Sequence, residues 1–141
     1  MHSSARTNTF KEAAERMRSR AGKSSLKLGM VQRFLSMHKG NPETLSIVHD
    51  CARICDSKGF QMLAACILRL GGNRKGAAEM YEKAKWYTLA ARTFLDAIKD
   101  SPENEEILRL RALECLEKHM KDYPETNRAG IYAKLGLESA T

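Results

Sequence analysis

The chain has 141 residues, of which 43% are hydrophobic and 29% are charged, and its formal net charge is +7. This length suffices for one domain that buries about two thirds of the surface of its unfolded chain, so folding needs neither a disulfide nor a metal. The longest apolar run, Met62 to Leu68, is far shorter than the roughly 20 residues of a membrane-spanning helix. We therefore expect no membrane span.

The first helix is predicted between Thr9 and about Ala21. Thr9 and Glu12 form the pattern of a capping box, and apolar residues follow at helical spacing from Phe10 to Met17. The arginines and serines of this segment also resemble a mitochondrial targeting sequence, against which its two glutamates argue. We therefore expect an amphipathic helix whose outer faces are basic.

Three further helices are predicted before residue 71. Ser24 or Ser25 can cap the second helix, which would end at Gly40. An Asn-Pro pair at 41–42 starts the third helix, which would end at Gly59. The fourth helix follows directly, and its apolar residues cover more than one face, so we expect it to contact neighbours on two sides.

The C-terminal half continues the helical pattern. Asn73 caps a helix that holds Tyr81, and very few residues separate it from the helix that holds Phe94. The short connection near Trp86 requires either two antiparallel helices or one bent helix. A longer helix opens at Pro102, and a short one closes the chain. With about seven helices and no alternating apolar pattern, the predicted fold class is all-α.

Small, aromatic and helix-breaking residues occur at characteristic intervals between positions 72 and 102: Ala78, Tyr81, Ala90, Phe94, Ala97 and Pro102. A small residue, an aromatic residue three positions later, an Ala-x-x-x-Phe pair and a final proline resemble the signature of the tetratricopeptide (TPR) repeat. The alanines would let two helices approach closely, and the rings would fill the space around them. The resemblance is confined mainly to residues 58–104.

A second register of the repeat competes with the first. It takes Gly72 and Asn73 as the turn inside a repeat, and it starts 13 residues earlier, because Ala77 replaces Ala90 in the pattern. Both registers cannot hold in one array of units of about 34 residues. We prefer the first, because Pro102 closes it. The competition indicates a degenerate α-solenoid of the kind found in vesicle-coat and ciliary-transport scaffolds.

The resemblance implies a short right-handed stack of antiparallel helical hairpins, a TPR-like α-solenoid. The charge distribution divides this stack. Residues 1–39 hold nine basic and two acidic side chains, whereas residues 40–141 hold fifteen of each. We therefore expect a basic N-terminal helical arm at residues 1–40 and a TPR-like helical-repeat domain at residues 41–141.

The chain offers little for catalysis. It has no motif for a nucleophile, a zinc protease or a phosphate-binding loop, so we expect no enzyme, no cofactor and no metal site. Its four cysteines form no C-x-x-C pair, and no secretory signal precedes them, which predicts a reducing intracellular compartment, the cytoplasm or alternatively the mitochondrion.

The expected function is a non-enzymatic protein–protein interaction scaffold or adaptor, as a component of a larger assembly. Its partner would be another protein, held as a peptide or helix in the groove or docked flat against the stack. An exposed apolar stripe on the second or last helix would favour self-association. In a TPR the first helix of each pair lines the groove, which implies Lys75, Glu79, Glu82 and Lys83.

The alternative function is RNA association through the basic arm. Contacts to phosphates give affinity without sequence choice, and no RNA-binding motif accompanies them here. The residues expected to contact nucleic acid or another anion are Arg16, Arg18, Arg20, Lys23 and Lys27.

Overall fold

The computed structural model describes residues 2–137 of the chain and the side chains of residues 9–137, and all its regular structure in this range is helical. This confirms the predicted all-α class. Eight α-helices occur in the described range, one more than the predicted count of about seven. They are α1 (His2–Gly22), α2 (Leu28–Met37), α3 (Thr44–Ser57), α4 (Gln61–Leu70), α5 (Arg74–Lys83), α6 (Tyr87–Asp96), α7 (Glu105–Asp122) and α8 (Arg128–Lys134), with short 3₁₀ segments η1 (Ala97–Lys99) and η2 (Pro102–Asn104) before α7.

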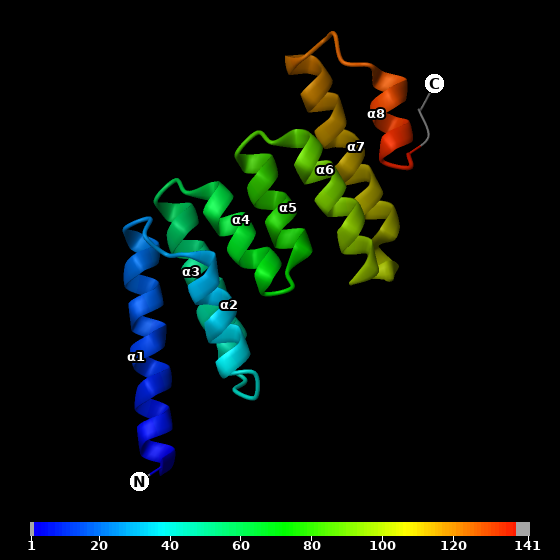
Figure 1. Ribbon diagram of the computed structural model, residues 1–141. Helices are drawn as coiled ribbons and strands as arrows, with labels where there is room; N and C mark the ends of the chain where they lie inside the picture. The colour runs from blue at the N-terminus through cyan, green and yellow to red at the C-terminus, as the bar shows by residue number, and fades with distance from the viewer. Residues whose placement is uncertain (1, 138–141) are drawn as a thin grey trace.

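The helices follow one another along an elongated stack. Figure 1 shows the described chain advancing from α1 at one end to α8 at the other. From α3 to α7 each helix packs against the next, whereas α1 packs mainly against α3, and α2 packs against α4 and α3. The segment around Trp86 is a turn between two antiparallel helices, α5 and α6, and not a bend in one helix.

Helices α4, α5 and α6 are built on one unit of 13 residues. Each helix has ten residues, and each is preceded by a turn whose left-handed residue has φ of +86° at Gly59, +85° at Gly72 and +66° at Lys85. After this residue, the next backbone N–H donates to the carbonyl five residues earlier, at 2.8 to 2.9 Å, which closes the preceding helix. The residues immediately before the three helices repeat at the same interval: Phe60, Asn73 and Trp86.

Each unit buries a pair of adjacent alanines. The pairs lie at 64–65, 77–78 and 90–91, and all six residues are fully buried. An alanine methyl group occupies little space between two helix axes, so each helix can approach both of its neighbours closely. Helix α5 packs against α4 and α6 to the same extent. Ala77 and Ala90, which distinguish the two competing repeat registers, hold equivalent positions in successive units.

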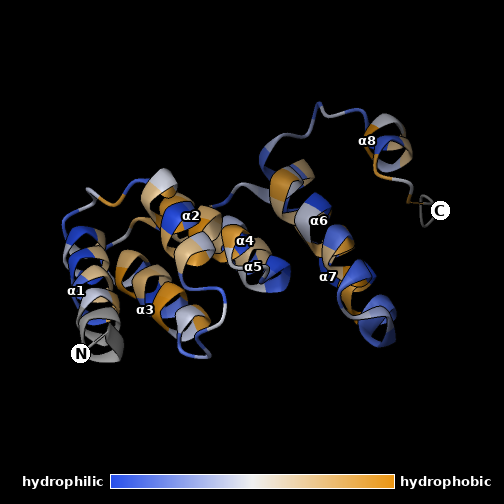
Figure 2. Cartoon of the chain, turned by 60° about the horizontal axis from the view of Figure 1, so that its bottom comes forward, coloured by the Kyte–Doolittle hydropathy of each residue, from blue (hydrophilic) through white to orange (hydrophobic). Residues whose placement is uncertain are grey.

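The hydrophobic core forms two clusters that meet at α4. The first joins α1 and α2 to α3 and α4 and includes Met17, Val31 and Val48; the second runs from α4 through α7 to Leu137. Helix α4 serves both, because Ala64 belongs to the first cluster and Ala65 to the second. Figure 2 shows α4 mainly in hydrophobic colours, as this position requires. The first cluster crosses the division at residue 40 that the charge distribution suggests.

Three predicted helix starts are wrong. Helix α3 begins at Thr44 and not at the Asn-Pro pair, whose Asn41 side chain accepts from the backbone N–H of Glu43 in the turn before the helix. Helix α1 already includes residues before Thr9, so Thr9 and Glu12 lie inside the helix and do not cap it. Helix α2 begins after Lys27, because Ser24 adopts a left-handed turn with φ of 58° and the Ser25 hydroxyl donates back to the carbonyl of Arg20. The cap expected at Asn73 is confirmed: its side-chain oxygen accepts from the backbone N–H of Gly76 at 2.8 Å.

Candidate interaction surface

The four residues predicted to line a groove all lie on α5, but most of their charges are paired within the chain. Glu82 accepts hydrogen bonds from Arg111 at 2.9 Å and from Lys118 at 2.8 Å, both on α7. Lys83 turns the other way and binds Asp56 of α3 at 2.8 Å. Their role toward a partner stays a prediction. The remaining two members are Glu79, whose carboxylate is 3.9 Å from Arg111, and Lys75, which is exposed and has no ion pair within the described residues.

Ion pairs connect the odd-numbered helices along one side of the stack. In addition to the contacts of α5 with α3 and α7, Arg18 of α1 binds Asp50 of α3 at 3.1 Å. These helices are two apart in the chain, so long side chains span the gap between them. This ladder of ion pairs links α1, α3, α5 and α7 on the side where the resemblance implies a groove.

Glu82 is the most buried acid of this ladder, with 15% of its side chain exposed. Burial raises the pKa of Glu82, but the hydrogen bonds and charges of Lys118 and Arg111 outweigh it, and the net shift is downward. The guanidinium of Arg111 also lies 4.6 Å from the centre of the Phe94 ring. Sequence analysis missed both cationic partners, because 29 and 36 residues separate them from Glu82.

The buried thiols are poor nucleophiles. Burial raises the pKa of Cys51 to about 12, and the neighbouring Cys55 and Asp50 add to the shift, which Arg18 opposes. Burial likewise raises the pKa of Cys115 to about 12, and the negative charge of Glu82 contributes. A nucleophilic cysteine needs a lowered pKa and an accessible sulfur, and these two have neither. Within the described side chains no three histidine, cysteine or acidic groups gather as a metal site.

The basic residues predicted to contact anions divide into two groups. Arg18 is half-buried and binds Asp50, so its charge is largely used inside the fold. The other four, Arg16, Arg20, Lys23 and Lys27, are exposed, and none forms an ion pair with a described side chain. Arg16 and Arg20 lie in the second half of α1, and Lys23 and Lys27 lie in the connection to α2. Contact with nucleic acid remains a prediction for these four.

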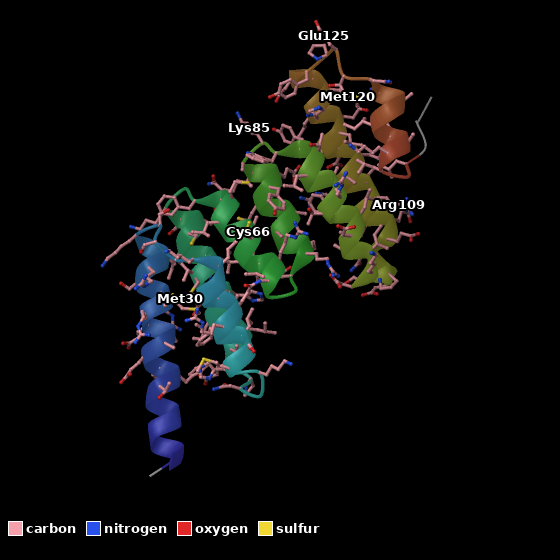
Figure 3. The ribbon with its side chains drawn as sticks, viewed as in Figure 1. Met30, Cys66, Lys85, Arg109, Met120 and Glu125 are labelled. Carbon is pink, nitrogen blue, oxygen red and sulfur yellow. The ribbon has the colours of Figure 1, made fainter. Side chains whose placement is uncertain are left out.

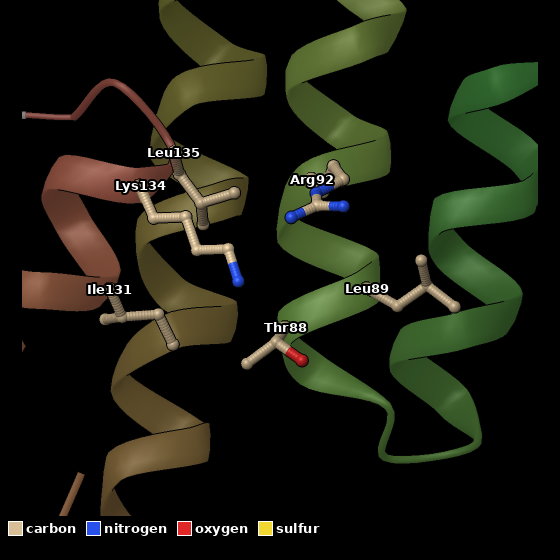
Figure 4. A pocket seen from close by; sticks show the side chains of 6 residues that line it. All are labelled: Thr88, Leu89, Arg92, Ile131, Lys134 and Leu135. Carbon is tan, nitrogen blue, oxygen red and sulfur yellow. The ribbon is translucent and has the colours of Figure 1, made fainter. Parts of the chain in front are cut away.

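Two of the open hollows between helices are lined by basic side chains from both helices. A hollow of about 290 Å³ lies between α6 and α8, and Figure 4 shows Arg92 and Lys134 on its two sides. A groove of about 180 Å³ lies between α1 and α2. The first is lined by Thr88, Leu89, Arg92, Ile131, Lys134 and Leu135. The lining of each combines apolar side chains with two arginine or lysine side chains.

These features define an all-α stack of short antiparallel helices with paired charges along one side. Comparison of the chain with protein-family models, curated proteins and solved structures found no match. Within the described residues no helix has the length and apolar character that a bilayer crossing requires.

Proposed function

We propose that the chain is a non-enzymatic protein–protein interaction module, a TPR-like α-solenoid that acts as a scaffold or adaptor within a larger assembly. One observation carries the proposal: α4, α5 and α6 repeat a 13-residue unit with the same turn and the same buried alanine pair. Repetition of this kind builds an extended surface from neighbour contacts, and extended surfaces of stacked helices serve to bind proteins. The right-handed sense of the stack belongs to this proposal.

The chemistry of the polar groups agrees with a binding role. The ion pairs along the odd-numbered helices, including those of Glu82 with Arg111 and Lys118, hold helices together. Burial keeps the thiols of Cys51 and Cys115 protonated and inaccessible. What the stack presents outward is a mosaic of charges with isolated apolar side chains. Among these is Trp86, which is 53% exposed at the turn before α6.

The test is capture of partners from a native extract by the immobilised whole chain, with nuclease treatment, followed by cross-linking. We expect protein partners that persist after nuclease treatment and cross-link to α3–α7. Replacing Lys75 and Glu79 by alanine should weaken the capture of these partners. Of the predicted groove residues, these two are the least engaged in ion pairs within the chain, so their charges are the most available to a partner. A matched control replaces the exposed Lys121 and Glu125 by alanine. Absence of nuclease-resistant partners would contradict the proposal.

A second candidate is RNA association, favoured by four cationic side chains in the second half of α1 and the turn after it, none of which pairs with a described acidic side chain. Phosphate contacts would make binding strongly salt-dependent. Replacing Arg16, Arg20, Lys23 and Lys27 by glutamine leaves the Arg18–Asp50 pair intact. If this variant loses all partners, and nuclease removes the same partners from the native chain, the function belongs to the basic arm.

A further inference from the structure

An open groove lies between α1 and α2. Helix α1 packs mainly on α3, and α2 packs on α4 and α3, so the two helices touch each other only slightly. Side chains from both helices line the space between them without closing it, and its volume is about 180 Å³.

The floor of the groove is apolar and adaptable. Met17 and Phe34 are buried, and Met30, labelled in Figure 3, is half-buried. Met37 also lines the groove and is 64% exposed. Methionine has three rotatable bonds and a polarizable sulfur, so a floor of methionines can fit apolar side chains of different shapes.

Three aromatic rings pack α1 against α2 beside the groove. The ring centres of Phe10 and Phe34 are 5.4 Å apart, and the His38 ring lies 5.1 Å from the first and 4.9 Å from the second. This cluster holds α1 and α2 apart at a defined spacing. The groove is therefore built into the fold of this end of the molecule.

The rim of the groove is cationic on both sides. Arg16 projects from α1 and Arg33 from α2, both are exposed, and neither pairs with a described acidic side chain. Glu12 is the one acidic residue of the lining. The surroundings have the same sign, because residues 9–39 hold eight basic and two acidic side chains. An occupant must therefore offer apolar groups to the floor and negative charge to both rims.

We infer that this groove binds an acidic amphipathic helix of a partner protein, an inference that rests on the proposed binding function. Such a helix presents apolar side chains at i, i+3, i+4 and i+7 to a groove. Its glutamates and aspartates, on the flanks of that stripe, would meet Arg16 on one side and Arg33 on the other. RNA fits less well, since a phosphate backbone has nothing to place on three methionines and a phenylalanine.

The test uses a fluorescent synthetic peptide of about 18 residues, five helical turns, with leucines on one face and glutamates elsewhere. Anisotropy titration against the whole chain should show binding, and a scrambled peptide of the same composition should bind at least about tenfold more weakly. The double variant Arg16→Glu/Arg33→Glu should lose at least about tenfold in affinity. Met37→Gln should weaken binding several-fold without affecting the fold, because this side chain is mostly exposed.

The matched control is Lys11→Glu/Lys23→Glu, which makes the same change in charge outside the groove. It should lose less than about threefold. Equal losses in both double variants, equal binding of the scrambled peptide, or preference for a single-stranded RNA or an anionic vesicle would overturn the inference. If no peptide binds but the chain still captures nuclease-resistant partners, the groove inference fails and the proposed function stands.

Discussion

Glu82 accepts hydrogen bonds from two cations of α7 while lying largely buried on α5. Removing its charge leaves Arg111 and Lys118 without their anion in a partly desolvated place. We expect Glu82→Gln to destabilise the fold by about 1–2 kcal/mol at neutral pH, measured by urea unfolding. Glu114→Gln, at an exposed position of α7 without an ion pair to a described residue, should change stability by less than about 0.5 kcal/mol.

This contribution should depend on pH in one direction. Because the fold lowers the pKa of Glu82 from 4.5, its stabilisation is fully present above that value and is lost as the pH falls through the lower, folded pKa. The stability difference between the native chain and Glu82→Gln should therefore shrink in acid. A difference that grows below pH 4.5 would contradict this assignment.

The cysteines should differ in reactivity. A pKa of about 12 in place of 9.0 lowers the thiolate fraction of Cys51 and Cys115 about a thousandfold at neutral pH. We expect the half-buried Cys66 to react first with a maleimide, and the three buried thiols to react only after unfolding. Mass spectrometry of labelled peptides, with and without denaturant, measures this order. Rapid labelling of Cys115 in the native chain would instead support a catalytic thiol.

At the scale of the helix, the turns of the 13-residue unit set the geometry. Lys85, labelled in Figure 3 at the turn between α5 and α6, has the left-handed backbone that glycine has in the two preceding units. Because a side chain is strained there, Lys85→Gly should stabilise the fold by about 0.5–1 kcal/mol. Gly72→Ala should destabilise it by about 1 kcal/mol. A methyl group at Gly72 meets no atom within 4 Å, so the loss reflects backbone strain alone.

The control for this pair is Gly40→Ala. A methyl group there also has free space, but the backbone is not left-handed, so thermal unfolding should show no loss of stability. If Gly72→Ala and Gly40→Ala behave alike, the left-handed turn does not determine the stability of the unit.

For the whole molecule, the first hydrophobic cluster determines which part can fold alone, because it joins α1 and α2 to α3 and α4. A chain that begins at Asn41 lacks Met17, Val31 and the other side chains that cover Val48 and Cys51. We expect the amides of α3 to lose hydrogen-exchange protection by more than about tenfold, while α5–α7 keep theirs. A chain that ends at Asp122 is the control. It removes the α8 side chains from the second hydrophobic cluster and should leave the amides of α3 protected.

Local signals predicted much of this fold. The cap at Asn73, the break before Pro102 and the period of the apolar residues depend on neighbours within a few positions, and these gave an all-α chain with most helices in place. The start of α2 was wrong because Ser25 bonds backward to the end of α1, and a serine before an apolar run does not show in which direction it will bond.

Contacts between residues far apart in the chain could not be predicted from a single sequence. Glu82 was expected on a binding surface, but α7 places two cations against it, and their pairing depends on how α5, α6 and α7 stack. The groove beside Met37 likewise exists because α1 and α2 each pack on α3 and neither closes on the other. Periodicity and turn chemistry thus specify the helices, because they act between near neighbours. The partners of each charge and the open spaces between helices arise only when segments far apart in the chain meet.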